Sequence, residues 1–197
     1  MKKVLLSALA VFAFTFANAQ EEETKSEGGF AQGDLFVSGA VTFGSEKTGD
    51  FKTNSFEFAP QIGYFLTENI AIGGKIGFGS YKEEFDGNDL EDMSGFTVGA
   101  FGRYYFTPAN QFSLFAQLGL DYSNMEDKLG DFKTSQIDAG LGLGMNYFVS
   151  SNFSIEAGVA ILGYSTNDNG GDGADATNSF GFGGDWRAVT FGVNYKF

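Results

Sequence analysis

The sequence predicts an all-β protein, an eight-stranded antiparallel up-and-down transmembrane β-barrel, and three observations lead to this prediction. Apolar residues recur at every second position, the period of a β-strand, in eight separate runs. The connections between these runs alternate between short and long. After residue 19 no stretch reaches the ~18 consecutive apolar residues that a membrane-spanning helix needs, and the mean hydropathy is only −0.10.

The first nineteen residues have the organisation of a secretory signal peptide. Lys2 and Lys3 form a basic start, 4–16 is apolar, and the small residues of 17–19 precede a cleavage site. We therefore expect cleavage after residue 19. The alternative, an uncleaved anchor, needs a longer apolar segment. Residues 20–32 are then a polar, acidic periplasmic tail, which we expect to be disordered as far as Gly29.

Each alternating run has one bulky apolar face and one face of small or polar residues. The runs have the ~9–11 residues of a tilted membrane strand, whereas strands of soluble proteins average ~5–6 residues. Closing such strands into a barrel removes the unpaired edges that lipid cannot satisfy. The eight runs are 35–43, 56–64, 70–78, 96–106, 112–122, 136–147, 153–161 and 189–197.

The connections alternate as they do in outer-membrane barrels. Short turns on the periplasmic side and long loops on the outside are typical of that class, and an even number of strands puts both termini on one side. Pro60 interrupts the second run, where we expect a bulge or a weak point. The short turns are 67–69, 107–111 and 149–152, and the long polar loops are 45–53, 82–92, 123–133 and 165–184.

Tyrosines with the parity of the apolar face are predicted to form an aromatic girdle at the periplasmic interface. They are Tyr64, Tyr104, Tyr147 and Tyr195, and the alternative is four unconnected core tyrosines. Tyr-Phe pairs also recur at spacings of 41 and 42 residues. A propeller blade has a similar period, but no Trp-Asp pair recurs with it, so the barrel is favoured.

The composition excludes several functional classes. The net charge is −13, or −15 once Lys2 and Lys3 are removed, whereas nucleic-acid binding needs clustered Lys and Arg. The chain has no Cys and no His, which removes thiolate metal sites and the commonest general base. Serine–histidine hydrolysis is therefore not available. We expect no enzyme activity and no cofactor, although Asp121 and Asp138 are carboxylates that acid–base chemistry could use.

The face of small and polar residues is predicted to line the lumen. An eight-stranded barrel is only wide enough to be filled by side chains. Because isolated charges there are costly, opposite charges should pair. We expect a polar network that holds the barrel shut, against the alternative of a gated narrow pore or proton path. The predicted network is Glu57, Lys75, Arg103, Gln117, Asp121, Asp138, Glu156 and Lys196, and Asn194 lies on the same face.

The longest loop contains a weak candidate for calcium binding. Residues 170–175 match the start of a single glycine- and aspartate-rich calcium repeat, and Asp168, Asp172 and Asp175 supply the carboxylates. Such repeats need stacked neighbours, so the simpler interpretation is an acidic surface loop. Arg187 has lipid-face parity near the outer rim, where we expect a contact with lipopolysaccharide phosphates.

The last run ends in alternating Val, Phe, Val and Tyr residues followed by a terminal Phe. This pattern resembles the C-terminal signal that the outer-membrane assembly machinery recognises, here Val193, Tyr195 and Phe197. Residues 33–197 as a whole resemble the small eight-stranded barrels of the OmpA/OmpX type, the outer membrane protein β-barrel domain family. The resemblance implies the cell outer membrane of a Gram-negative bacterium as the location.

The predicted function is that of an integral outer-membrane barrel with a structural or surface-interaction role. Its expected partners are outer-membrane lipid, lipopolysaccharide and the assembly machinery, with no nucleic acid, and the barrel is expected to be a monomer. One alternative is a narrow porin-like channel for small solutes. A second is a soluble lipocalin-like barrel that binds apolar ligands, whose apolar face would point inward instead.

Overall fold

The computed structural model describes residues 28–170, 173–184 and 189–197. All regular elements in this part of the chain are β-strands, and every strand pairing is antiparallel. No helix within these ranges is long and apolar enough to cross a membrane. The strands are β1 (Leu35–Thr48), β2 (Phe51–Phe65), β3 (Ile70–Phe85), β4 (Asn88–Tyr105), β5 (Phe112–Asp127), β6 (Phe132–Phe148), β7 (Phe153–Asn167), β8 (Thr177–Phe182) and β9 (Thr190–Lys196).

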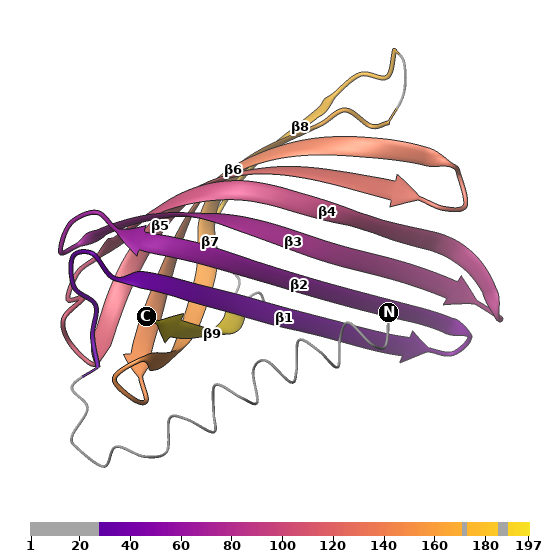
Figure 1. The fold of residues 1–197 in the computed structure, drawn as a ribbon. Helices are drawn as coiled ribbons and strands as arrows, with labels where there is room; N and C mark the ends of the chain where they lie inside the picture. The colour runs from indigo at the N-terminus through magenta and orange to yellow at the C-terminus, as the bar shows by residue number, and fades with distance from the viewer. Residues whose placement is uncertain (1–27, 171–172, 185–188) are drawn as a thin grey trace.

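The strands close into a barrel with eight strand positions (Figure 1). Strands β1 to β7 pair in sequence order, and β9 joins β7 to β1, which completes the circle. β8 and β9 share the eighth position, because β9 pairs with residues 153–158 of β7 and β8 with residues 162–167. The structure therefore confirms the predicted eight-stranded up-and-down barrel.

The three predicted short turns are confirmed, at residues 66–69, 106–111 and 149–152. We call this end of the barrel the short-turn end, and the opposite end the hairpin end. Both β1 and β9 reach the short-turn end, where Phe197 N donates to Leu35 O at 2.9 Å.

Three of the four predicted long loops are wrong, because the strands continue through most of them. β1 and β2 are separated only by Gly49 and Asp50, and β3 and β4 only by Asp86 and Gly87. Asp86 and Gly87 have φ of 49° and 77°, which suits a tight Asp-Gly hairpin turn. Many of the side chains paired across these strands near the turns are polar, such as Ser45 with Asn54 and Lys52 with Glu84. β8 likewise occupies part of the fourth predicted loop.

Of the two outcomes expected at Pro60, the structure shows the weak point and not the bulge. It lies opposite Gly39 in β1, and pairing between β2 and β3 resumes beyond it in an unchanged register. Proline lacks the N–H that the ladder needs, so the local effect is a break in pairing with β3. The register shifts instead at Glu83/Glu84 opposite β4 and at Leu141/Gly142 opposite β7.

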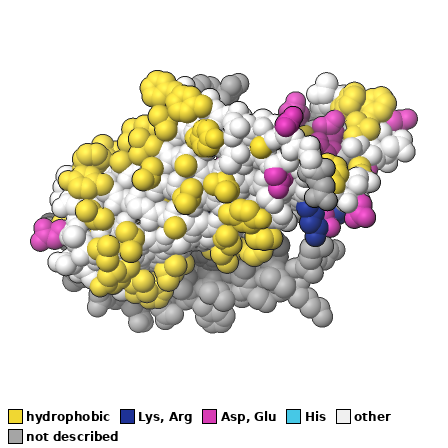
Figure 2. Space-filling model, turned by 90° about the horizontal axis from the view of Figure 1, so that it is seen from above, with side chains coloured by type: hydrophobic (Ala, Val, Ile, Leu, Met, Phe, Trp, Pro, Cys, Tyr) yellow, Lys and Arg dark blue, Asp and Glu magenta, His cyan; other side chains and the backbone are white. Residues whose placement is uncertain are grey.

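The two faces of the barrel wall differ as the alternation predicts. The bulky apolar residues point outward and stay exposed, as with Ile62, Phe78 and Leu118. Figure 2 shows these apolar side chains spread over the wall, with most of the charged residues in this view gathered at one end. This arrangement is the opposite of the one that the lipocalin-like alternative requires.

The buried core lies inside the barrel, toward the short-turn end. Most of it is aromatic: Phe30, Phe36, Phe65, Ala71, Phe101, Tyr105, Phe115 and Phe148.

Candidate functional site in the barrel lumen

Arg103 is the centre of the polar contacts inside the barrel. β4 places its side chain inward, where only 2% of it is exposed. The guanidinium forms two parallel bonds with Glu156 of β7, with Nη1–Oε2 at 2.7 Å and Nη2–Oε1 at 2.9 Å. Nε donates to Gln117 Oε1 of β5 at 2.5 Å, and Nη1 donates to Tyr105 Oη at 3.1 Å. The network thus joins the neighbouring strands β4 and β5 to β7, which lies three positions from β4 in the barrel wall.

Aromatic rings surround the guanidinium. Its Cζ lies 4.4 Å from the ring centre of Phe115, 5.1 Å from Phe101 and 5.7 Å from Phe36. These rings fit because the facing strands carry glycine, and a Cβ at Gly63 or Gly144 would collide with the rings of Phe36 and Phe115. Such a cation over several ring faces is held more strongly where water is excluded.

A second ion pair lies in the same lumen, between Lys75 of β3 and Asp121 of β5. Their Nζ and Oδ2 are 2.8 Å apart. A cavity of about 370 Å³ is lined by both ion pairs, together with Glu57, Gln61 and Gln117 among others. Glu57 has no ion-pair partner among the described residues. Among the described residues, the cavity lining therefore has two paired cations and one carboxylate without an ion-pair partner.

The structure brings most of the predicted network together, but not all of it. Glu57, Lys75, Arg103, Gln117, Asp121 and Glu156 line the one cavity. Asp138 faces Asp121 across β5 and β6, but its Oδ1 accepts from Gln136 Nε2 at 2.8 Å and it is not part of the cavity lining. Lys196 lies at the short-turn end, apart from the rest.

Lys196 instead contacts the residues that precede the barrel. Its Nζ donates to Gly29 O at 2.5 Å, lies 3.6 Å from Asp34 Oδ2 and is 5.6 Å from the ring centre of Phe148. The lysine thereby fixes the N-terminal segment against the barrel end.

Phe30 is a buried residue that the sequence pattern did not indicate. It is 2% exposed, and its ring lies 4.7 Å from that of Phe65, 4.9 Å from Phe148 and 5.3 Å from Tyr105. Phe30 N also donates to Pro108 O at 2.7 Å. The expectation of disorder as far as Gly29 is therefore wrong for Gly28 and Gly29, which are buried too. The available signal was a single Phe in an otherwise small and polar tail.

Small neutral residues complete the lumen wall beside Arg103. Ser38, Asn194 and Ser154 lie in register across β1, β9 and β7, and all three are buried. Asn146 Nδ2 donates to Ser154 Oγ at 2.9 Å. The base of the lumen thus contains buried hydroxyl and amide side chains as well as aromatic rings.

The four predicted girdle tyrosines lie near the short-turn end on the outer face. Tyr64, Tyr104 and Tyr147 are each 45–48% exposed, and Tyr195 is half-buried. Tyr104 packs edge-on against Phe106, with ring centres 5.3 Å apart, and Tyr195 packs in the same way against Phe197 at 5.0 Å. Of the C-terminal pattern, Tyr195 and Phe197 therefore form one aromatic pair in which Phe197 is exposed and Tyr195 half-buried, and Val193 is half-buried as well.

The calcium candidates are not gathered into a site. Asp168 Oδ1 accepts from the N–H groups of Ser135 and Gly170 at 2.8 and 3.0 Å, and these bonds hold the pKa of its carboxyl below the usual range. Asp175 contributes its backbone oxygen to Asn169. Asp172 and Arg187 lie outside the described residues. Within the described ranges, no group of three or more Asp, Glu, His or Cys could hold a metal ion.

Comparison with known proteins agrees with this geometry. Residues 6–197 match the family described as outer membrane protein beta-barrel domain. No curated protein matches the chain.

Several solved structures are similar. The chain is 15% identical to the outer membrane protein OprG of Pseudomonas aeruginosa, with a TM-score of 0.50 and coverage of 86% of this chain and 98% of OprG. The N-terminal β-barrel domain of OprF from the same organism is 16% identical, with a TM-score of 0.48 and coverage of 85% and 100%. Neisserial surface protein A is 19% identical, with a TM-score of 0.49 and coverage of 84% and 100%.

At these identities the structural likeness concerns the fold alone. The family match covers nearly the whole sequence. The chain therefore belongs to the outer membrane protein β-barrel domain family, whose members sit in the outer membrane.

Proposed function

We propose that this protein is a closed outer-membrane barrel with a structural or surface-interaction role, whose lumen is plugged by its own side chains. The two parallel bonds between Arg103 and Glu156 carry this proposal, because they bridge the lumen between β4 and β7, beside the rings of three phenylalanines. Below them, Phe30 packs among Phe65, Tyr105 and Phe148. A hydrated ion would have to displace both layers to pass.

Single-channel recording on purified protein in planar bilayers tests the plug. We expect no steady conductance from the wild-type protein. We expect conductance to appear only when both layers are opened, as in Phe30→Ala combined with Glu156→Gln, while an exposed change such as Leu66→Ala leaves the barrel silent. Steady conductance from the wild-type protein would contradict the plug.

A narrow channel for small solutes is the second candidate, and the cavity of about 370 Å³ favours it. With Glu57, the described cavity lining has one more carboxylate than cations. If the barrel conducts, we therefore expect it to prefer cations. Reversal potentials in a salt gradient measure this preference, and Glu57→Gln should weaken it.

The proposal includes partners and excludes catalysis. Outer-membrane lipid and lipopolysaccharide would contact the exposed apolar wall, and the assembly machinery would recognise Val193, Tyr195 and Phe197.

Deleting Phe197 should lower the amount of protein in the outer membrane of cells, yet leave refolding in detergent intact. Equal amounts in the membrane would contradict the assembly signal. No enzymatic role is proposed, because the chain contains no His and no Cys.

A further inference from the structure

The outer wall of the barrel is layered toward its hairpin end. On β2 the outward residues run from Tyr64 through Ile62 and Phe58 to Phe56, and are then followed by Asn54 and Lys52. β1 and β3 follow the same order, with apolar residues, then Ser45 and Ser80, then Lys47 and Lys82 at the top of the wall. Ser45 Oγ lies 3.1 Å from Asn54 Oδ1. A neutral polar row therefore separates the apolar wall from a charged row.

The height of the charged row matches the lipid headgroup layer. Tyr64 and Lys52 lie twelve positions apart in β2. At ~3.3 Å per residue and a strand tilt of ~40°, this separation is about 30 Å along the barrel axis. The apolar band of an outer-membrane barrel is ~25 Å tall. With the tyrosines at one edge of that band, the lysines stand roughly 5 Å beyond the other.

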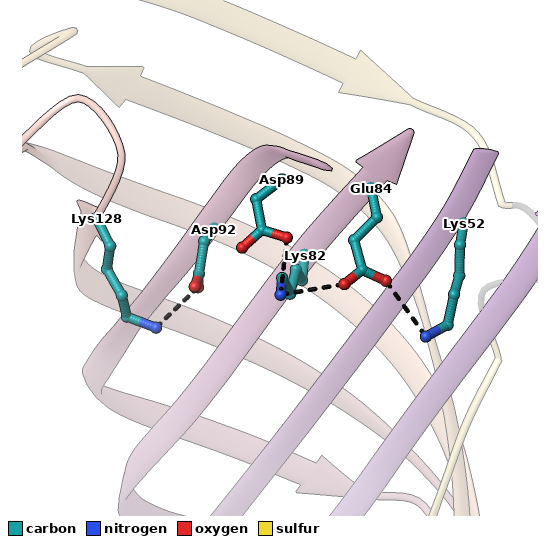
Figure 3. A network of polar contacts seen from close by, with 6 residues as sticks. All are labelled: Lys52, Lys82, Glu84, Asp89, Asp92 and Lys128. Carbon is teal, nitrogen blue, oxygen red and sulfur yellow. Dashed lines mark hydrogen bonds and ion pairs between the residues drawn. The ribbon is translucent and has the colours of Figure 1, made fainter. Parts of the chain in front are cut away.

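Three lysines on the adjacent strands β1, β2 and β3 have only two acidic partners between them among the described residues. Lys52 Nζ and Lys82 Nζ contact the two oxygens of Glu84 at 3.3 and 3.1 Å, and Lys82 also contacts Asp89 at 2.9 Å (Figure 3). Lys47 faces Lys52 directly across β1 and β2, and has no acidic partner within the described ranges. These five side chains carry a net charge of +1 in a chain whose net charge is −13.

An anion between Lys47 and Lys52 would remove an unfavourable contact. Like charges directly opposite one another destabilise a strand pair, and lysine binds phosphate as a compact point charge. The hydroxyl of Ser45 and the amide of Asn54 lie one outward position below and can donate hydrogen bonds. Glu46 and Glu83, which adjoin Lys47 and Lys82 in the sequence, alternate with the lysines and so belong to the inner face. Glu84 is the acid of β3 that shares the outer face with the lysines.

We propose that Lys47, Lys52 and Lys82, with Ser45 and Asn54, bind the phosphate group of a lipid headgroup in the outer leaflet. This inference rests on the proposed function, because it needs the barrel to stand in the membrane with its hairpin end outward. The same charged row continues over β4 to Lys128, which contacts Asp92 at 2.8 Å (Figure 3). Because Lys128 has an acidic partner that it does not share with Lys52 or Lys82, we place the site on β1 to β3.

The test is titration of the refolded full chain, in a neutral detergent, with phosphatidic acid as the probe, followed by native mass spectrometry. Lys47→Gln is the informative variant, because it removes no ion pair, and we expect it to weaken binding about fivefold. The double variant Lys47→Gln with Lys52→Gln should bind phosphatidic acid more weakly than the single variant does. Lys133→Gln is the matched control, since it removes one outward lysine that is 3.8 Å from Glu126, and it should bind as the wild type does.

Folding is checked first on the same samples, by the faster migration of unboiled protein on a gel. If the wild type and both lysine variants fold but bind phosphatidic acid equally, the proposed phosphate site is wrong and the proposed function is unaffected. If ~10 mM inorganic phosphate displaces all the lipid, the site takes free anions and the headgroup assignment is wrong. If the wild type shows no folded band in detergent or vesicles, the proposed function fails, and this inference fails with it.

Discussion

At the scale of single residues, Arg103 is a position where we expect substitution to have a large effect on the free energy of unfolding. Its guanidinium is almost fully buried, so its removal would leave Glu156 as an uncompensated charge. The cost of breaking such a buried pair is typically larger than the benefit of having it, because desolvation offsets much of the attraction. The pair therefore defines one arrangement of the lumen more than it adds stability.

We expect Arg103→Met to lower the free energy of unfolding by about 3–5 kcal/mol. Urea unfolding in vesicles measures this change. In the matched control, Arg103→Met combined with Glu156→Leu, no charge is left unpaired, and much of the loss should be recovered. Equal losses in the single and double variants would show that packing around Arg103, and not charge pairing, is what matters.

Phe30 is the second residue with a strong expected effect, although it precedes the barrel. Phe30→Ala should cost about 3–5 kcal/mol of unfolding free energy, because a large ring is removed from an aromatic cluster. Leu66→Ala, at the same end but 45% exposed, should cost much less. A Phe30→Ala loss no greater than that of Leu66→Ala would mean that the N-terminal segment does not pack as described.

At the scale of elements, the hairpins determine the structure of the hairpin end of the barrel. Their strands lack apolar alternation, yet they continue because tight turns and cross-strand polar pairs satisfy the backbone. The turn between β3 and β4 uses Asp86 and Gly87, both with positive φ, and is followed by ion pairs at Lys52, Lys82 and Glu84.

Gly87→Ala tests the turn. Gly87 has a φ of 77°, which costs an L-residue roughly 1–2 kcal/mol, so the unfolding free energy should fall by about that amount. Gly181→Ala is the control, because Gly181 lies in β8 without a positive φ and with open space around it. A larger effect at Gly181 would contradict the turn geometry.

The ion pairs make the stability of the β3–β4 hairpin depend on pH. Hydrogen bonds from Lys82 and Lys52 hold the pKa of the Glu84 carboxyl below its usual value of 4.5. Folding therefore favours the ionised form. Its contribution is complete above the usual pKa and is lost as the pH falls through the lowered one.

We expect the difference in urea midpoint between wild type and Glu84→Gln to be constant at neutral pH and to shrink below a pH of about 4.5. A difference that grows on acidification would reverse the sign and contradict the contacts of Glu84.

At the scale of the whole molecule, closure is the property that matters. β9 pairs with both β1 and β7 and so closes the wall. The closed wall has an apolar outer face and a polar, partly filled interior. Such a structure resists detergent, because every strand in the closed part has two neighbours. We therefore expect the unboiled, detergent-extracted protein to migrate faster on a gel than the boiled protein. Identical migration, with the protein in the soluble periplasmic fraction, would contradict a closed membrane barrel.

The sequence by itself determined the barrel, its strand number and the direction of each face. These features follow from a local period of two and from the short turns, and both are visible in a single chain. It also identified Arg103, Glu156, Lys75 and Asp121 as lumen residues, because parity alone decides which way a side chain points.

Only the tertiary structure decided which of these charges meet and that Phe30 packs among the aromatic rings at the short-turn end. Arg103 and Glu156 lie 53 residues apart, and their contact depends on the curvature and register of the whole sheet. Phe30 has no alternating neighbours, so no local pattern predicts its burial. The hairpin strands were missed for a related reason: their pairing is stabilised by contacts between strands, which a one-dimensional hydrophobic pattern does not record.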